Sequence, residues 1–153
     1  MRRKDKEIID REKIDEILNR AEIIRIAMSE NDKPYIVCVN FGYDGDSIYF
    51  HSAKEGLKLD MIAKNPNVCF QTEIDAEVIK SDLGCDWTEK YKSVVGFGKA
   101  EILTKKEDKR NALSVMMEKY SPGKTYELPD KTLNIVTTVK IKIDEIYGKQ
   151  NND

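Results

Sequence analysis

The sequence is poor in the residues that build several common kinds of site. It has one histidine, His51, in 153 residues, so metal sites with several histidines are excluded and any catalytic dyad or triad with histidine must use this one. Its three cysteines, Cys38, Cys69 and Cys85, form no C-x-x-C pair. That odd number indicates neither a disulfide framework nor a zinc site. A reducing compartment, and therefore a cytoplasmic location, is the simplest expectation.

The sequence also lacks an excess of charge of either sign and a long hydrophobic run. The 26 Lys and Arg balance 28 Asp and Glu, whereas binding a phosphate backbone needs a basic surface, so we expect no nucleic-acid partner. No apolar run approaches the roughly 20 residues that span a bilayer, so we expect no membrane association. The length fits a single domain over residues 1–153, with a charged leader over residues 1–10 and a flexible tail over residues 149–153.

The spacing of apolar residues predicts an order of elements that does not alternate as β-α-β. A helix is indicated behind Asp10, and two further helices follow capping boxes at Ser52 and Thr104. The segment at residues 34–43 is apolar on both faces, so we expect each face to be covered by a barrel interior, a helix or a partner subunit. Mainly β structure is predicted, an antiparallel barrel with about three short helices. Strands are expected at residues 23–28, 34–43, 47–51, 68–79 and 91–103, and again from Val139.

The junction between the strand at residues 47–51 and the following helix gathers groups that suit an anion. His51 and Ser52 stand there, Gly56 allows close backbone approach, and Lys54 and Lys58 lie near the helix start. A phosphate would fit. A structural interpretation is equally complete, because Ser52 can cap the helix while both lysines face solvent. A lone histidine at a strand end is also more often an ordinary surface residue than a catalytic one.

Asn40 interrupts an otherwise apolar strand. Its amide could form hydrogen bonds that only stabilise the fold, or it could face the edge of a ligand ring, with Phe41 as a flat neighbour. Trp87 could line the same cavity or could belong to the core. Gly96 and Gly98 do not form a dinucleotide fingerprint, because no third glycine or helix start follows them, and they indicate a bulge or close packing.

Three segments in this order resemble one protein family. They are PYIVCVNFGYDGDSIYFHSAKEGLKLDMIAKNPNVCF, then W-x-x-x-Y-K-S-V-V-G-F-G-K-A, then the helix end MMEKY. Together they resemble the Nim-type branch of the pyridoxamine 5′-phosphate oxidase-like flavoproteins, over nearly the whole chain. The resemblance implies an FMN-binding split β-barrel that dimerises and holds its cofactor at the subunit interface. Nim-type members are associated with reduction of 5-nitroimidazole drugs to amines.

Carried onto this sequence, the resemblance implies an FMN site shared by two subunits. It places Val39, Asn40 and Phe41 beside the isoalloxazine ring. The partner subunit would supply Ser93 and Val94. The resemblance makes His51 the catalytic residue. The ribityl phosphate and the ring edge would be held by His51, Ser52, Ala53, Gly56 and Lys58.

Two departures from the vitamin B6 oxidases of that family stand out. Their basic phosphate clamp is reduced to Lys58 with Lys54 nearby, and their arginine-containing C-terminal motif is missing from KIKIDEIYGKQNND. The resemblance therefore implies a homodimeric FMN-dependent oxidoreductase with a small-molecule electron donor and acceptor, such as a nitroaromatic compound, and no metal. Two alternatives stay open, a flavin- or haem-binding module without turnover and a cofactor-free barrel.

Overall fold

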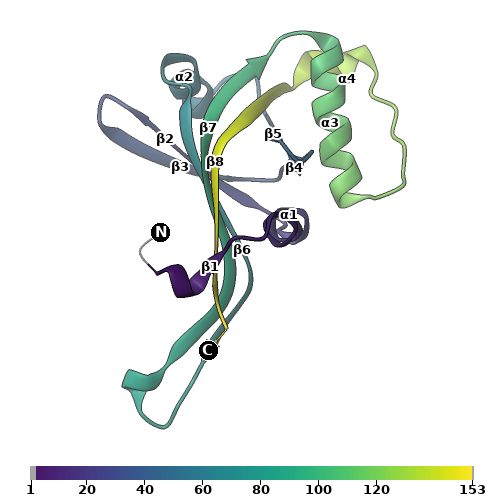
Figure 1. Cartoon of the computed structure of the whole chain (residues 1–153). Coiled ribbons are helices and arrows are strands. Elements are labelled where there is room, and N and C mark those ends of the chain that lie inside the picture. The colour runs from purple at the N-terminus through teal and green to yellow at the C-terminus, as the bar shows by residue number, and fades with distance from the viewer. Residues whose placement is uncertain (1–2, 153) are drawn as a thin grey trace.

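A computed structural model describes residues 3–152 of the chain (Figure 1). In this part of the chain, strands pair antiparallel in one sheet in the order β3-β2-β6-β7-β8-β5-β4, and β1 pairs with β8. The strands are β1 (Glu7–Ile8), β2 (Ile24–Glu30), β3 (Lys33–Val39), β4 (Gly42–Tyr43), β5 (Ser47–Ser52), β6 (Asn67–Ile79), β7 (Thr88–Leu103) and β8 (Thr137–Asn151). The helices are α1 (Arg11–Arg20), α2 (Leu57–Lys64), α3 (Lys106–Tyr120) and α4 (Asp130–Ile135), with short 3₁₀ turns η1 (Lys4–Lys6) and η2 (Gly84–Asp86).

The sheet curves without closing on itself. The long strands β6, β7 and β8 form its spine, the β2–β3 hairpin continues it on one side, and β5 and β4 continue it on the other (Figure 1). Helices α3 and α4 lie together beside β4 and β5. The prediction of a mainly β, antiparallel split barrel with helical decoration is confirmed.

The first helix forms as the sequence predicts. The Asp10 side chain accepts a hydrogen bond from the Glu12 backbone N–H, which satisfies one of the free donors at the helix start. One face of the helix then buries Ile14, Ile17 and Leu18 against the sheet. Because these residues follow the helical repeat, a single apolar stripe accounts for the position of α1.

Strand β5 separates two hydrophobic cores. Alternation along a strand sends Ile48 and Phe50 into the larger core, inside the curved sheet. Tyr49 points the other way, into a smaller core under α3 that includes Leu113 and Leu133. Residues on this second face of β5, His51 among them, therefore look toward α3 and α4.

The two glycines of β7 are explained by close packing and a bulge, as predicted. A Cβ atom on Gly96 would lie 2.2 Å from the Phe70 ring, and one on Gly98 would lie 2.2 Å from the Lys142 carbonyl oxygen. The register between β7 and β8 shifts between Phe97 and Gly98. Side chains at either glycine would force neighbouring backbone or a buried ring to move.

Both predicted capping boxes are wrong. Helix α2 begins at Leu57 behind Gly56, α3 begins behind Lys105, and neither helix has a side-chain cap. Ser52 does not cap because it continues β5 and pairs with Thr137 of β8. Strand pairing therefore overrides the local helix-start pattern at this position.

The chain end also differs from the prediction. Residues 149–151 are not a flexible tail, because β8 pairs with β7 as far as Asn151. The Asn151 side chain donates to the Glu89 carbonyl at 2.6 Å and to the Thr88 hydroxyl at 3.1 Å. Among the described residues no helix is long and apolar enough to cross a membrane.

Within one chain, only one face of residues 34–43 is covered, so a partner subunit is left as the expected cover of the other face. Strand β3 lies at the edge of the sheet, where Ile36 is 59% exposed. Trp87 is about half exposed, near the far tip of the β6–β7 hairpin, where its indole N–H donates to the Ser81 carbonyl. It therefore does not share a cavity with Asn40.

Candidate functional site

His51 lines an apolar cavity between the sheet and the two C-terminal helices. Its strand position is directly opposite Thr138 of β8, and the histidine side chain is exposed. The cavity has a volume of about 430 Å³. Its lining residues are Asn40, His51, Leu113, Met116, Met117, Tyr120, Ser121, Tyr126, Leu128, Thr132 and Val136.

The lining of this cavity, which we call the His51 cavity, suits a flat, uncharged ligand. Helix α3 supplies one wall through Leu113, Met116 and Met117. Asn40 and His51 present polar groups from the sheet side, and the described lining includes no lysine, arginine, aspartate or glutamate. A mainly apolar pocket with a few polar groups is the usual form of a small-molecule site.

Tyr120 fixes the segment that joins β3 to β4. Its hydroxyl accepts a hydrogen bond from the Phe41 backbone N–H at 3.1 Å and donates to the Glu22 carbonyl at 2.5 Å. The end of α3 thereby holds the backbone next to Asn40. Sequence reasoning did not single out Tyr120. Its bonds reach residues about 80 and 100 positions away, beyond any local pattern.

The junction after β5 holds an unusual polar group. Ser52 is buried, and its hydroxyl oxygen has no hydrogen-bond partner within the described residues. Buried polar groups are almost always paired, so an unpaired hydroxyl is the kind of group that a ligand could satisfy. The structural interpretation of Ser52 as a helix cap is excluded by the helix start at Leu57.

The start of α2 adds further groups that suit an anion. Gly56 has φ of +146°, a conformation that favours glycine, with open space where a Cβ would lie. The first helical N–H groups, those of Leu57 and Lys58, have no acceptor inside a helix. Lys58 is half-buried, Lys54 is exposed, and neither forms an ion pair within residues 3–152. The residues here fit a phosphate.

The other residues predicted to contact FMN lie in different places around the sheet. Val39 packs partly against the large core, and Ala53 is exposed. The side chains of Phe41 and Val94 are completely buried in the core, so only their backbone could touch a ligand. Ser93, by contrast, lines an outer cavity.

That outer cavity has a volume of about 320 Å³ and shares no residue with the His51 cavity. It is lined by Ser93, Val95, Tyr147 and Lys149 of β7 and β8. Tyr147 is 40% exposed, and Phe97, the next outward residue along β7, is 45% exposed. Within one chain, His51 and Ser93 are therefore not brought together.

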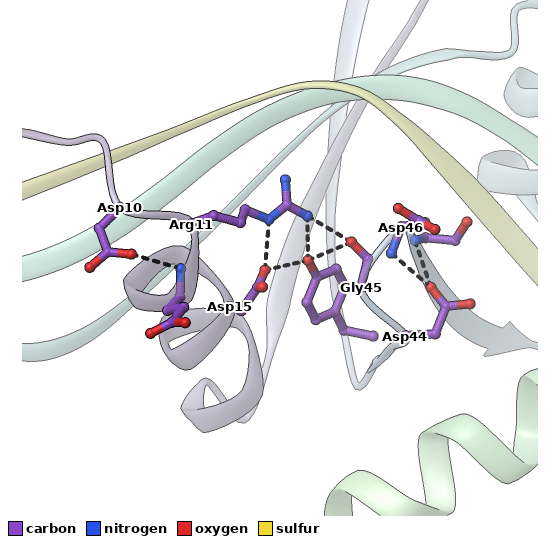
Figure 2. Close-up of polar contacts among 9 residues, drawn as sticks. Asp10, Arg11, Asp15, Asp44, Gly45 and Asp46 are labelled. Atoms are coloured by element: carbon purple, nitrogen blue, oxygen red, sulfur yellow. Dashed lines mark hydrogen bonds and ion pairs between the residues drawn. The ribbon is translucent and has the colours of Figure 1, made fainter.

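A network of polar contacts holds the β4–β5 turn on α1 (Figure 2). Arg11 donates to the Asp15 carboxylate at 2.9 Å and to the Gly45 carbonyl at 2.7 Å. The Tyr43 hydroxyl donates to Asp15 at 2.6 Å. Burial, together with the Asp15 carboxylate, raises the pKa of Tyr43 to about 12. The Tyr43 hydroxyl therefore stays protonated at neutral pH and can keep donating its hydrogen bond to Asp15 of α1.

The sequence matches, over residues 10–150, a family described as pyridoxamine 5′-phosphate oxidase. The chain belongs to this family. Among solved structures it is similar to a protein of Bacteroides thetaiotaomicron assigned to 5-nitroimidazole antibiotic resistance, with 29% identity and a TM-score of 0.83 over 94% of this chain and 86% of that one. The predicted pyridoxamine 5′-phosphate oxidase-like family, with its likeness to the Nim-type branch, is confirmed.

Other relatives of this pyridoxamine 5′-phosphate oxidase family member are more distant. A FAD and haem binding protein of Mycobacterium smegmatis has a TM-score of 0.87 at 20% identity, covering 97% of this chain and 74% of that one. The flavocytochrome Anf3 of Azotobacter vinelandii has a TM-score of 0.83 at 17% identity, covering 96% of this chain and 70% of that one. At such identities the likeness shows the fold alone. An uncharacterized protein of Rhizobium meliloti is 30% identical over 64 residues, 42% of each chain.

Proposed function

We propose that this protein is a homodimeric FMN-dependent oxidoreductase that reduces flat, uncharged acceptors, nitroaromatic compounds among them. The observation that carries the proposal is the unpartnered Ser52 hydroxyl beside the start of α2. Together with the free N–H groups there and the Lys58 ammonium, it would form a cradle for the cofactor's phosphate. Family membership and the 29% identity to the Bacteroides protein support the same assignment.

The acceptor would enter the His51 cavity. Bound FMN would supply the electrons, while the protein positions the reactants and excludes water. The Asn40 amide can hydrogen-bond a ring edge, and His51 can donate a proton to a reacting oxygen. In reduction of a nitro group, that group gains electrons and protons and loses its oxygens as water. A small-molecule donor such as a reduced nicotinamide would restore the electrons.

The second subunit would complete the site. Ser93 lies on the outer face of β7, away from His51 in the same chain. That face also exposes Phe97 and Tyr147, and apolar side chains gathered on one face favour association. A symmetric dimer would bring the partner's outer face to the ring, and would cover β3, where Ile36 is exposed.

The test is a titration of the purified protein with FMN, followed by visible absorbance and flavin fluorescence. Lys58→Ala should weaken binding about tenfold or more, because a charge-assisted bond to phosphate is lost. Lys105→Ala, an exposed lysine at the start of α3, is the matched control and should bind as the wild type does. A wild-type protein that stays colourless, with no change in FMN fluorescence, would leave the cofactor-free barrel as the correct interpretation.

A haem-binding module without turnover is the second candidate. The observation that favours it is a single histidine at the wall of an apolar cavity, the arrangement of an axial haem ligand. Addition of haemin with recording of the Soret band separates the two. A sharp Soret shift that His51→Ala removes, with no FMN binding, would favour haem. Turnover of a nitroaromatic with reduced nicotinamide and FMN would favour the oxidoreductase.

A further inference from the structure

A second cavity, which we call the Lys119 cavity, lies on the other side of the α3 C-terminal half. Its volume is about 540 Å³, and it shares no residue with the His51 cavity. One wall is the β4–β5 turn, held in place by the network of Figure 2. The lining residues are Asn19, Tyr43, Asp44, Ser114, Val115, Glu118 and Lys119.

Lys119 lines this cavity, and its amine packs against a buried aromatic ring and a backbone carbonyl. Its Nζ atom donates to the Leu18 carbonyl near the end of α1 and lies 3.4 Å from the centroid of the Phe41 ring. Phe41 is itself completely buried. Among the described residues, no carboxylate lies within ion-pair distance of this amine.

The two carboxylates that share the cavity are engaged elsewhere. Asp44 accepts hydrogen bonds from the Ser47 backbone at 2.8 Å and from the Tyr49 hydroxyl at 2.7 Å. Glu118 accepts from the Gly123 backbone at 3.1 Å. The other titratable lining group, the Tyr43 phenol, is neutral. Because the amine is buried without a nearby counter-ion, its charged form is disfavoured, and this lowers the pKa of Lys119 to about 8.

The lowered pKa leaves more of this amine in its uncharged, nucleophilic form near neutral pH. With a pKa of about 8, against the ordinary value of 10.5, a far larger share of Lys119 is uncharged at pH 7.5 than of an ordinary lysine. An ordinary lysine is uncharged in only about one molecule in a thousand at that pH. Only the uncharged amine has the lone pair that attacks a carbonyl carbon, as in lysine-based Schiff-base catalysis.

We propose that Lys119 is a covalent binding site for small, uncharged hydroxyaldehydes. The Nζ lone pair attacks the aldehyde carbon and a carbon–nitrogen bond forms. The aldehyde oxygen then leaves as water, with the two hydrogens of the amine, and an imine remains. Hydroxyl groups on the ligand suit the polar wall of Asn19, Ser114 and Glu118. The carboxylates of Asp44 and Glu118 disfavour an anionic aldehyde.

The experiment is reductive trapping of the imine in the native protein. Glycolaldehyde is added at pH 7.5 with cyanoborohydride, and peptide mass spectrometry measures the label at each lysine. Lys119 should be labelled at least about tenfold faster than the exposed Lys105 and Lys124. Its rate should level off above about pH 8.5, while the other lysines continue to gain. Glyoxylate, an anionic aldehyde of similar size, should label Lys119 more slowly.

Two controls keep the result interpretable. Unfolding in urea should remove the preference for Lys119, because the preference arises from the folded environment. Lys119→Arg should lose the fast site while the other lysines are labelled as before. Equal labelling of Lys119 and the exposed lysines in the folded wild type would overturn the proposal, as would faster labelling by glyoxylate. Neither result depends on FMN binding.

Discussion

The hydroxyl of Tyr120 accepts the backbone N–H of Phe41 at 3.1 Å, which ties the last turn of α3 to the segment between β3 and β4. Tyr120→Phe removes this bond and the one to the Glu22 carbonyl. Loss of these hydrogen bonds should lower the free energy of unfolding, measured by urea denaturation. The loss should be only about 1 kcal/mol, because Tyr120 is partly exposed and water can replace part of the bonding. FMN affinity should fall as well, since the backbone beside Asn40 is no longer fixed.

Tyr126→Phe is the matched control for that variant. Tyr126 lines the same His51 cavity, but its hydroxyl has no hydrogen-bond partner among the described residues. Its removal should change neither stability nor FMN affinity. Equal behaviour of the two variants would show that the Tyr120 hydroxyl does not position the segment.

Ser52→Ala should separate stability from binding. Removing an unpaired buried hydroxyl relieves a desolvation cost, so the protein without cofactor should be unchanged or up to about 1 kcal/mol more stable. FMN affinity should fall about tenfold if Ser52 contacts the phosphate. Ser47→Ala, at the other end of β5, tests the strand alone and should leave affinity unchanged. Unchanged FMN affinity in Ser52→Ala would remove Ser52 from the cofactor site.

His51→Gln should slow turnover without unfolding the protein. The histidine side chain is exposed, so the fold does not depend on it. We expect turnover of a nitroaromatic acceptor to fall on the order of 100-fold, with FMN affinity nearly constant, if His51 donates a proton. Thr132→Val changes another polar group in the same cavity and should retain most activity. Wild-type rates in His51→Gln would assign that residue to the cavity wall only.

Short-range sequence patterns correctly predicted elements whose residues interact with near neighbours in the chain. The Asp10 cap with its apolar stripe gave α1, and alternation after Val139 gave β8. The capping box at Ser52 failed because strand pairing with β8, a distant segment, decides where β5 ends. The roles of Tyr120 and Lys119 could not be predicted, since each depends on a contact with residues about 80 or more positions away.

Gly98→Ala tests the close packing of β7 on β8. An added Cβ would lie 2.2 Å from the Lys142 carbonyl oxygen, and backbone cannot move aside as a flexible side chain can. We expect a loss of about 1 to 3 kcal/mol in the free energy of unfolding. Gly84→Ala has open space around its new atom and should stay within about 0.5 kcal/mol. Similar denaturation midpoints for the two variants would contradict the close contact.

Lys119 should make the stability of the protein depend on pH. Its pKa is about 8 when folded, against an ordinary value of 10.5, so between these values the unfolded chain binds more protons than the folded one. Stability therefore rises as the pH increases through this window, and the cost of burying the charged amine is fully present below pH 8.

Lys119→Met removes that titration while keeping an apolar side chain of similar length beside Phe41. Urea denaturation of both proteins at pH 7.5 and pH 10 isolates the effect, because the other lysines and tyrosines titrate in both. Relative to Lys119→Met, the wild type should gain about 1 kcal/mol in the free energy of unfolding over this range, because solvent screens the partly exposed amine and reduces the full linkage effect. If the two proteins differ in free energy of unfolding by the same amount at both pH values, the Lys119 amine is as well solvated in the folded state as in the unfolded chain.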